Sequence, residues 1–349
     1  MRTVTAVVAG LLACAALPAA SSALFAHGGA LDAAESPPPP TFTLEKVGER
    51  VYCLFGRGGN VGFIVTDAGV AVVDDQYGDV APGIVEQIRT VTDKPIRYLI
   101  NTHYHADHTG GNPTFQPFAA IVAHDTVRPR LLEYPLVVRS TFPGRIKALE
   151  VEIEAIRDPA DPYREALSKD VGIMKFFLGS AQSFDPAAAA PPGITYDSRV
   201  TLWLGDQPVE VFHVGPGHTD GDSIVWFRRE KVLHAGDLLF NGLIPFIDTA
   251  GGGSAAGFLE NLDRILATIP ADTRVIAGHG PVTDMAGLRR ARDFMKDLHV
   301  AVEKAVQQGL SRAEAARTVR LDTYPDIKPA FRTLANDVLA IYDETRSRR

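Results

Sequence analysis

Three histidines and an aspartate lie within one short stretch of the chain, YLINTHYHADHTGGN at residues 98–112. They are His103, His105, Asp107 and His108, and an apolar run precedes them. Imidazole nitrogens and carboxylate oxygens are ligands of zinc and of other first-row metals. In an extended segment His103 and His105 point to the same side, because side chains alternate with a period of two. The spacing therefore predicts a metal site directly after a strand.

Three further candidate ligands each follow a predicted strand, in a turn that contains glycine. His218 comes after VEVFHV, Asp237 after KVLHA and His279 after RVIA. Loops at one edge of a sheet can converge on one point, and glycine lets the backbone turn sharply there. Seven ligands are too many for one tetrahedral ion but fit two ions that share a bridge. The predicted division is His103, His105 and His218 on the first ion, Asp107, His108 and His279 on the second, and Asp237 as the bridge.

Short strands separated by Gly, Asn and Asp are expected to position these ligands. The predicted strands are FTLEKVGE, RVYCLFG, NVGFIVTD, VAVVDDQ and IRYLI, followed later by RVTLWLGDQPVEVFHVG, DSIVWFRREKVLHAGD and RVIAG. Helices are predicted over residues 80–92 and in AGFLENLDRILATI. The glycine-rich GRGGNVG, residues 56–62, does not open a helix, so a hairpin turn is predicted there.

Residues 113–195 are interpreted as a long insertion, for which a lid is one candidate role, within a domain spanning residues 42–284. Helical spacing occurs at 128–138 and 145–158, the middle of the segment is irregular and charged, and 183–194 reads as a loop. Residues 285–349 are expected to be helical. There Ser311 and Glu314 form a capping-box pattern, and Pro329 suits the first position of a last helix.

The N-terminus has the pattern of an exported protein. Residues 1–26 carry one Arg, then an Ala-rich apolar run and small residues suited to cleavage, as in a signal peptide. Residues 27–41 are rich in proline and small residues, which predicts a tether. Cys14 in LLAC resembles the lipobox of bacterial lipoproteins, but Leu12 is unusual at its position, so a cysteine within a cleaved region is the preferred interpretation. We therefore expect a periplasmic or secreted protein.

The composition of the chain argues against a nucleic-acid partner and a membrane span. The formal net charge is −7, and nucleic-acid binders normally show a basic excess, so no nucleic-acid partner is expected. No segment after the signal peptide is expected to span a membrane. Cys53 would be the only cysteine of the mature chain and is interpreted as a buried small apolar residue. The sequence leaves the oligomeric state open.

The stretch THYHADH resembles the H-x-H-x-D-H signature of the metallo-β-lactamase superfamily, and His218, Asp237 and His279 match its later metal motifs in order. The resemblance implies an α/β fold, an αββα sandwich, here with a C-terminal helical extension, and a dinuclear site that is usually zinc. Iron or manganese would suit the same ligands. AVVDDQ resembles the first motif of the family and puts Asp74 at its acidic position. Asp74 is expected either to hydrogen-bond a ligand histidine or to serve in a turn.

The expected chemistry is hydrolysis of a small molecule with a carbonyl group. Divalent ions lower the pKa of bound water towards about 7, so a hydroxide bridging the two ions would attack the carbonyl carbon. Asp107 would orient the nucleophile or move a proton. Asp237 resembles the thioesterase and lactonase branches, because secreted zinc β-lactamases usually have Cys or Ser at that place. Esters, thioesters, lactones and β-lactams therefore stay open as substrates.

The whole chain is most similar to exported β-lactamase-like, quinoprotein-relay-associated hydrolases. The alternatives are an iron-dependent oxidoreductase of the sulfur-dioxygenase type and a non-catalytic periplasmic accessory protein. Four aromatic or aliphatic residues after Asp237 are expected either to form an apolar wall near the metals or to pack in the core: Phe240, Leu243, Ile244 and Phe246. The histidines that match no motif are expected to be structural: His124, His213, His234 and His299.

Overall fold

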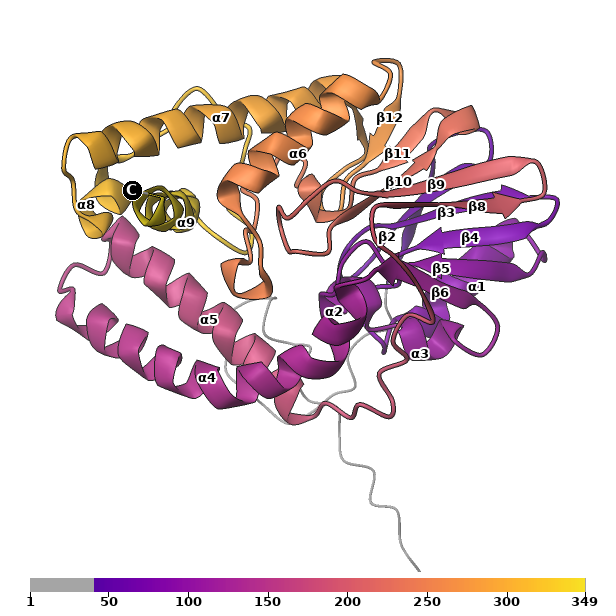
Figure 1. The fold of residues 1–349 in the computed structure, drawn as a ribbon, viewed down its shortest axis with the longest axis horizontal. Helices are drawn as coiled ribbons and strands as arrows, with labels where there is room; N and C mark the ends of the chain where they lie inside the picture. The colour runs from indigo at the N-terminus through magenta and orange to yellow at the C-terminus, as the bar shows by residue number, and fades with distance from the viewer. Residues whose placement is uncertain (1–40, 349) are drawn as a thin grey trace, which may run out of the picture. The chain divides into compact units, whose positions relative to one another are not determined.

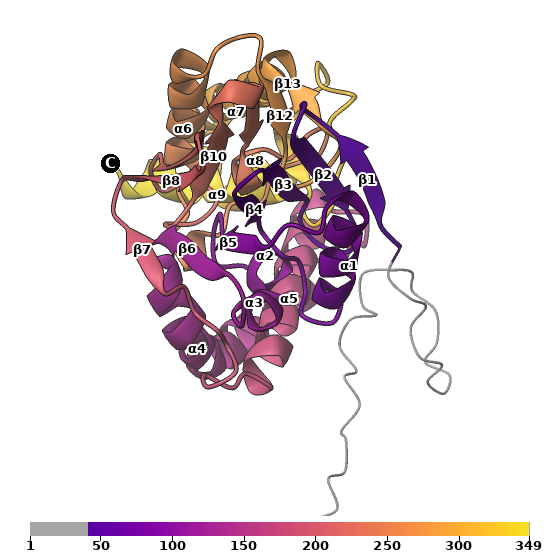
Figure 2. The same cartoon turned by 90° about the vertical axis from the view of Figure 1, so that its right-hand side faces the viewer.

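The computed structural model describes residues 41–348, so the expected signal peptide and nearly all of the tether lie outside the described residues. Two β-sheets face each other (Figure 1, Figure 2). The first contains seven strands in chain order: β1 Thr43–Lys46, β2 Val51–Phe55, β3 Val61–Thr66, β4 Gly69–Val73, β5 Ile96–Ile100, β6 Ala120–His124 and β7 Ile194–Tyr196. Strands β1 to β4 pair antiparallel, and β4 to β7 pair parallel.

The second sheet has the order β13-β12-β11-β10-β9-β8. Its strands are β8 Arg199–Leu204, β9 Gln207–His213, β10 Ser223–Phe227, β11 Val232–His234, β12 Arg274–Ile276 and β13 Thr283–Asp284. Only β11 and β12 pair parallel in this sheet. The predicted strands are all present, and residues 56–60 connect β2 to β3 in the expected hairpin.

Alternation along the strands builds two cores from the second sheet. Val225 and Phe227 of β10 face the first sheet, where Cys53 and Ile64 lie. The intervening Ile224 and Trp226 face the other way, into the core that α6 Ala255–Thr268 and α7 Met285–Gln307 form. This is the two-residue period of a sheet that is buried on both faces. Cys53 is a free, fully buried cysteine, as its apolar surroundings in the sequence indicated.

Helix α1, Ala81–Val91, covers the outer face of the first sheet. Its Ile84 and Ile88 pack against Phe63 and Leu99. With α6 and α7 on the other outer face, the layers run helix, sheet, sheet, helix, so the expected αββα sandwich with a helical C-terminal region is confirmed.

The segment expected to be an insertion is more regular than predicted. Its ends belong to the first sheet as β6 and β7, so the part outside the sandwich is narrower than residues 113–195. After the short α2 Ala106–Thr109 and α3 Asn112–Phe115, two long helices form a hairpin: α4 Val127–Ala155 and α5 Pro162–Gln182. The prediction that the middle of this segment is irregular was wrong, because residues 162–182 are helical. Asp161 caps this helix by accepting a hydrogen bond from the Tyr163 N–H, and Pro162 starts it.

The helix hairpin α4–α5 is fixed to the C-terminal helices α8 Arg312–Thr318 and α9 Leu334–Ser347 (Figure 1). Leu167 of α5 packs with Ala316 and Leu339. Arg332 is paired with Asp170 at 2.6 Å. The apolar contacts and this partly buried ion pair hold the hairpin in one position.

The capping box of Ser311 and Glu314 is present at the start of α8, as predicted. The prediction that the last helix begins at Pro329 was wrong. It begins at Leu334, because Asn336 accepts a hydrogen bond from the backbone N–H of Thr333 and closes the first turn there. Phe331 therefore lies before the helix and not on its face.

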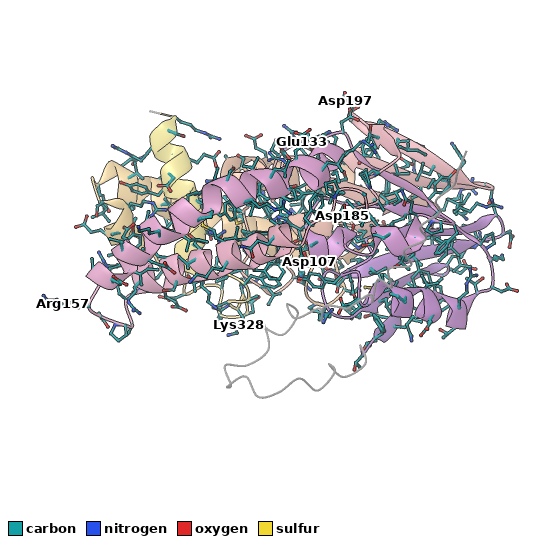
Figure 3. All side chains as sticks on the ribbon, turned by 90° about the horizontal axis from the view of Figure 1, so that it is seen from below. Asp107, Glu133, Arg157, Asp185, Asp197 and Lys328 are labelled. Carbon is teal, nitrogen blue, oxygen red and sulfur yellow. The ribbon has the colours of Figure 1, made fainter. Side chains whose placement is uncertain are left out.

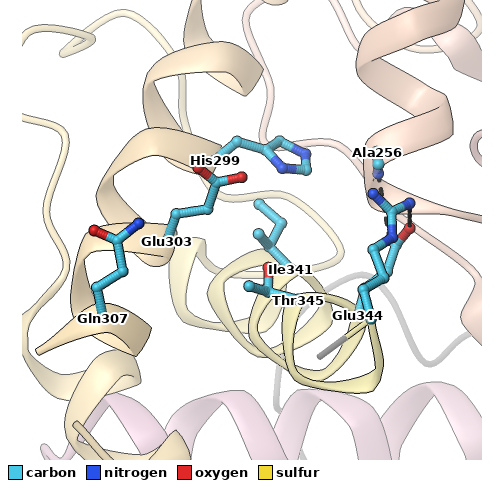
Figure 4. A pocket seen from close by; sticks show the side chains of 8 residues that line it. Ala256, His299, Glu303, Gln307, Ile341, Glu344 and Thr345 are labelled. Atoms are coloured by element: carbon cyan, nitrogen blue, oxygen red, sulfur yellow. Dashed lines mark hydrogen bonds and ion pairs between the residues drawn. The ribbon is translucent and has the colours of Figure 1, made fainter. Parts of the chain in front are cut away.

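The C-terminus also stabilises the start of α6. The carboxylate of Glu344 accepts hydrogen bonds from the Ser254 hydroxyl at 2.9 Å and from the Ala255 N–H at 2.8 Å, which satisfies free donors of the helix start. Figure 4 shows Glu344 at one side of a cleft of about 310 Å³, with His299 and Glu303 at the other. The cleft contains none of the seven candidate ligands. No helix within residues 41–348 combines the length and the apolar character needed to cross a bilayer.

Asp337 makes the stability of the fold depend on pH. It is fully buried, and no hydrogen bond from the described residues reaches its carboxylate. Burial raises the pKa of Asp337 to about 8, despite the nearby Arg332. Because the pKa in the folded state exceeds the unfolded value of about 4, the folded state binds more protons between these values and loses stability as the pH rises. We expect Asp337→Asn, which cannot ionise, to raise the Tm relative to the parent more at pH 8 than at pH 6.

Thermal denaturation of the chelator-treated protein at both pH values measures this, because metal binding then adds no pH dependence of its own. Asp322→Asn, at an exposed position, is the matched control. An equal Tm difference at pH 6 and pH 8 would show that Asp337 does not titrate in the folded protein.

Candidate metal centre

All seven predicted ligands lie beyond the carboxyl ends of strands, at one end of the sandwich. The chain leaves β5 at Ile100 and enters the turn that holds His103 to His108. Asp237 lies in the short 3₁₀ helix η2, Gly236–Leu238, after β11, and His218 and His279 follow β9 and β12. Because β11 and β12 are parallel neighbours, Asp237 and His279 leave the sheet at the same edge.

The structure brings the seven residues together in two adjoining groups. His103, His105, His218 and Asp237 form one group, and Asp107, His108 and His279 form the other. Within each group the ligand atoms all lie within 4.8 Å of one another. The six residues other than Asp237 divide as the sequence predicts for two ions, and Asp237, predicted as the bridge, groups with the first three histidines.

Asp237 lies between the two groups. Its Oδ1 is 3.2 Å from His108 Nε2, and its Oδ2 is 3.4 Å from both His218 Nε2 and His279 Nε2. His103 Nε2 is 3.8 Å from the same Oδ2. Oδ1 thus faces the second group, and Oδ2 faces histidines of both groups. A carboxylate that contacts both groups has the position of a bridging ligand.

Hydrogen bonds on the outer side of four histidines determine which nitrogen faces the centre. His108 Nδ1 donates to Asp74 at 2.8 Å, His105 Nε2 donates to Asp248 at 2.9 Å, and His218 Nδ1 donates to a backbone carbonyl, that of Phe246. The Thr102 hydroxyl donates to Asp74 and can therefore accept from His103 Nδ1 at 3.0 Å. Each acceptor holds a proton on the outer ring nitrogen and directs the opposite nitrogen at the centre, where a neutral imidazole presents a lone pair.

The inward nitrogens are close enough to repel one another. His218 Nε2 is 3.2 Å from His103 Nε2 and 2.9 Å from His105 Nδ1. Lone pairs at these distances have no proton to share once the outer nitrogens hold theirs. Asp237 Oδ1 is also buried and accepts no hydrogen bond from any described residue. A divalent cation satisfies nitrogen and carboxylate lone pairs together, so this donor set fits metal ions.

The electrostatics favour the ligand forms in the first group. Burial lowers the pKa of His218 to about 4, and burial followed by the neighbouring His108 lowers the pKa of His103 well below its ordinary value. Both imidazoles are therefore neutral near pH 7. Burial alone would raise the pKa of Asp237, but His108 and the other histidines outweigh it and lower that pKa well below its usual range.

The second group carries excess negative charge. Burial would lower the pKa of His279, but Asp237 and Asp107 outweigh burial and raise it to about 9. The same two carboxylates, with Asp74, raise the pKa of His108. Asp107 Oδ2 is 3.3 Å from His279 Nε2 and 3.6 Å from His108 Nε2. The carboxylates favour the protonated, positively charged form of these two imidazoles. A bound cation can supply the same positive charge in place of the protons.

Asp74 hydrogen-bonds a candidate ligand histidine, which is the first of the two roles expected from the sequence. Its Oδ2 accepts from His108, and its Oδ1 accepts from the backbone N–H of Thr102 at 2.8 Å. Its φ of 62° is left-handed, which turns the chain sharply after β4. The neighbouring Asp75 points elsewhere and accepts from the Gly111 N–H. Asp74 therefore positions a candidate ligand from within the turn.

Sequence reasoning missed Asp248. Its carboxylate accepts from His105 Nε2, from the Tyr104 hydroxyl and from the Gly251 N–H. Burial would raise the pKa of Asp248, but the hydrogen bond from His105 lowers it below its ordinary range. Asp248 belongs to no motif in FIDTAGGG, so only the tertiary structure reveals its contact with a residue 143 positions earlier.

The four apolar residues after Asp237 divide between the two expected roles. Phe240 stacks on His279 with centroids 5.3 Å apart, and Phe246 stacks on His105 at 5.7 Å. Ile244 lies in the core between sheet and helices, and Leu243 packs against that core. Aromatic faces against the ligand rings exclude water from the sides of the centre and hold the rings in place.

Glycine is required where the β2–β3 hairpin reaches the centre. A Cβ atom on Gly59 would lie 2.1 Å from His108 Cε1. The GRGGNVG segment thus allows close backbone approach to a ligand. The four histidines outside the motifs lie elsewhere in contact with protein groups, His234 with the Asn60 carbonyl and His299 with the Ala255 carbonyl, while His124 and His213 stack on each other.

The fold and the site define an α/β sandwich protein with a candidate two-metal centre at one end of its sheets. The sequence profile of the metallo-beta-lactamase superfamily matches residues 54–279, and the chain belongs to that superfamily.

Two relatives illustrate its range. The metallo-beta-lactamase type 2 of Bacillus cereus is 22% identical over 66% of this chain and 70% of its own length. The linear primary-alkylsulfatase of a Pseudomonas species (strain ATCC 19151) is 21% identical over 80% of this chain and 53% of its own length. The solved sec-alkylsulfatase Pisa1 from Pseudomonas sp. shares the fold with a TM-score of 0.61 and 17% identity, over 87% of this chain and 50% of its own. The chain spans about half the length of these two alkylsulfatases.

Asp248 should support metal binding through His105. We expect Asp248→Asn to weaken binding of one of two zinc ions by about 10- to 100-fold, because the imidazole loses the acceptor that fixes its tautomer and orientation. Titration of metal-free protein against a chromogenic chelator measures both affinities. Asp206→Asn, on an exposed turn, is the control. Unchanged affinity for both ions in Asp248→Asn would rule out this positioning role.

Proposed function

We propose that the chain is an exported hydrolase that holds two divalent metal ions, zinc in the first instance, and cleaves a carbonyl-containing small molecule. The position of Asp237 between two groups of inward-facing histidines carries this proposal. Superfamily membership supports it, because the relatives include hydrolases of two substrate classes. Export rests on the pattern of residues 1–26 alone.

Bound metal ions would supply a nucleophilic hydroxide at neutral pH and polarise the bond that is cleaved. The chain's own residues orient these partners. Asp237 would contact both ions, while Asp74, Asp248 and Thr102 keep the histidine nitrogens unprotonated on the inner side. Asp107 has the most exposed side chain among the acidic ligands, at 19%. Because solvent reaches its carboxylate, it could orient water or accept its proton.

The preferred substrates are esters, thioesters and lactones, with β-lactams as a test case. Asp237 supports the first three through the family resemblance of its position. Sulfate esters are a second candidate, because the alkylsulfatase aligns over 80% of this chain and the B. cereus β-lactamase over 66%. The alignment with the alkylsulfatase therefore includes more of this chain than the alignment with the β-lactamase does.

Metal removal should destabilise the fold. A ligand that binds only the folded state raises stability by mass action, and here it also neutralises buried carboxylates. We expect a chelator to lower the Tm by several degrees and zinc to restore it. In Asp237→Ala the shift should shrink sharply, because the bridge is lost. Calorimetry with and without chelator measures this, and an equal zinc-dependent shift in Asp237→Ala would contradict the bridging role.

The activity test starts with protein shown to contain two zinc ions per chain. We expect chelator-sensitive hydrolysis of aryl esters, thioesters or lactones, and a chromogenic cephalosporin tests β-lactams directly. Octyl sulfate, with release of inorganic sulfate as the readout, tests the second candidate. Asp107→Asn should lower kcat by about 100-fold or more, as for loss of a general base. Metal analysis of the variant separates lost chemistry from lost metal. Failure of the two-zinc protein on every class would overturn the proposal, and oxygen consumption with a thiol or persulfide substrate that appears only after iron loading would favour the oxidoreductase alternative.

A further inference from the structure

A cavity of about 410 Å³ lies between the helix hairpin and the loop that carries the first ligands. Its walls are mostly apolar side chains of α4 and α5, among them Leu131, Val138 and Phe177, together with Phe184 just after α5. The opposite wall is formed by residues 104–106, 109, 110 and 113. The cavity is large enough for a medium-sized apolar group.

The cavity adjoins the metal centre through His105. The His105 ring and Ala106 line it, and Asp107 is the next residue. Phe177 both lines the cavity and lies against the His105 ring, with centroids 5.5 Å apart. Figure 3 shows Asp185, which borders the cavity, and Asp107 near one end of the hairpin, with Arg157 at its far end. A group in the cavity would therefore have its attachment point beside the ligand loop.

The charges around the cavity favour an uncharged occupant. Arg130 borders it, but the guanidinium is paired with Asp220 at 2.6 Å and lies over the Tyr134 ring. Asp185 at the rim is exposed and would repel an anion. The occupant therefore gains most from burial of apolar surface.

The cavity is preformed because its helices are fixed from behind. Tyr163 and Leu167 of α5 pack against α8 and α9, and Asp161 is paired with Arg317 at 2.8 Å. The side chains around such a site need little ordering when an apolar group enters. Most of the free energy gained by burying that group therefore contributes to binding affinity.

We propose that this cavity binds an alkyl or aryl group of the substrate, next to the bond that is cleaved at the metal centre. The proposal rests on the hydrolase function above and adds the substrate class: molecules with an uncharged apolar group of several carbons attached to the hydrolysable group. Each methylene buried in the cavity should raise kcat/KM by about two- to fourfold until the cavity is full.

The first measurement is kcat/KM for p-nitrophenyl esters from acetate to decanoate with the zinc-loaded protein. Leu131→Trp fills the cavity, and Leu136→Trp, at a position of α4 that is 53% exposed, is the matched control. We expect the parent and Leu136→Trp to prefer octanoate over acetate by at least about tenfold. In Leu131→Trp this ratio should fall towards one. Ser180→Phe fills the same cavity from α5, with exposed Ser168→Phe as its control, in case Leu131→Trp does not fold.

The second measurement needs no catalysis. N-phenyl-1-naphthylamine is uncharged and fluoresces strongly in apolar surroundings, and we expect it to bind the parent and both control variants and to be displaced by octanol. Binding should weaken at least tenfold in the cavity-filling variants. Equal dye binding in all variants, or ester hydrolysis that ignores chain length, overturns the proposal. Dye binding that the cavity-filling variants abolish, in a two-zinc protein that hydrolyses none of the substrate classes tested above, leaves the cavity assignment standing and refutes the hydrolase function.

Discussion

The buried carboxylate of Asp237 among inward-facing imidazoles is the constraint on which the rest of this structure depends. Two carboxylates and five imidazoles occupy a space where water is excluded, and their lone pairs face one another at about hydrogen-bond distance. Burying such charge without a counter-charge is expensive. Bound cations remove that cost, so the centre and the fold around it are stabilised by the same event.

The protein holds this unfavourable arrangement with acceptors taken from distant parts of the chain. Asp74 comes from the turn after β4, Asp248 from the loop before α6, and the Phe246 carbonyl from the same loop. Each fixes one imidazole from behind. Since the Asp74 and Asp248 carboxylates are themselves buried and accept further hydrogen bonds, the orientations of the rings that they hold are determined before any ion arrives. Such preorganisation is what a catalytic centre requires.

The metal ligands could be predicted from the sequence because each stands in a short glycine-containing turn after a strongly apolar strand. That pattern is local, and so are the hairpin at 56–62 and the cap at Ser311. The missed features are those that depend on contacts between distant segments. Asp248 resembles any loop aspartate until His105 is placed beside it. Helix α5 has a weak apolar face of its own, because α8 and α9 supply part of the burial. Pro329 was a plausible helix start by local rules, but Thr333 and Asn336 close the first turn further on.

The C-terminal helices act on the centre without touching its ligand loop. Arg332, just before α9, pairs with Asp170 of α5 and also lies 4.8 Å from the centroid of the Phe246 ring, which stacks on His105. One guanidinium thus connects the helix hairpin, the aromatic wall and a candidate ligand. An ion pair only 12% and 18% exposed is costly to break, because the remaining partner would keep its charge without compensation. The position of α5, and with it the shape of the apolar cavity, is therefore set by residues beyond the sandwich. Sequence changes in the last helices can therefore alter the shape of this cavity while every candidate metal ligand stays in place.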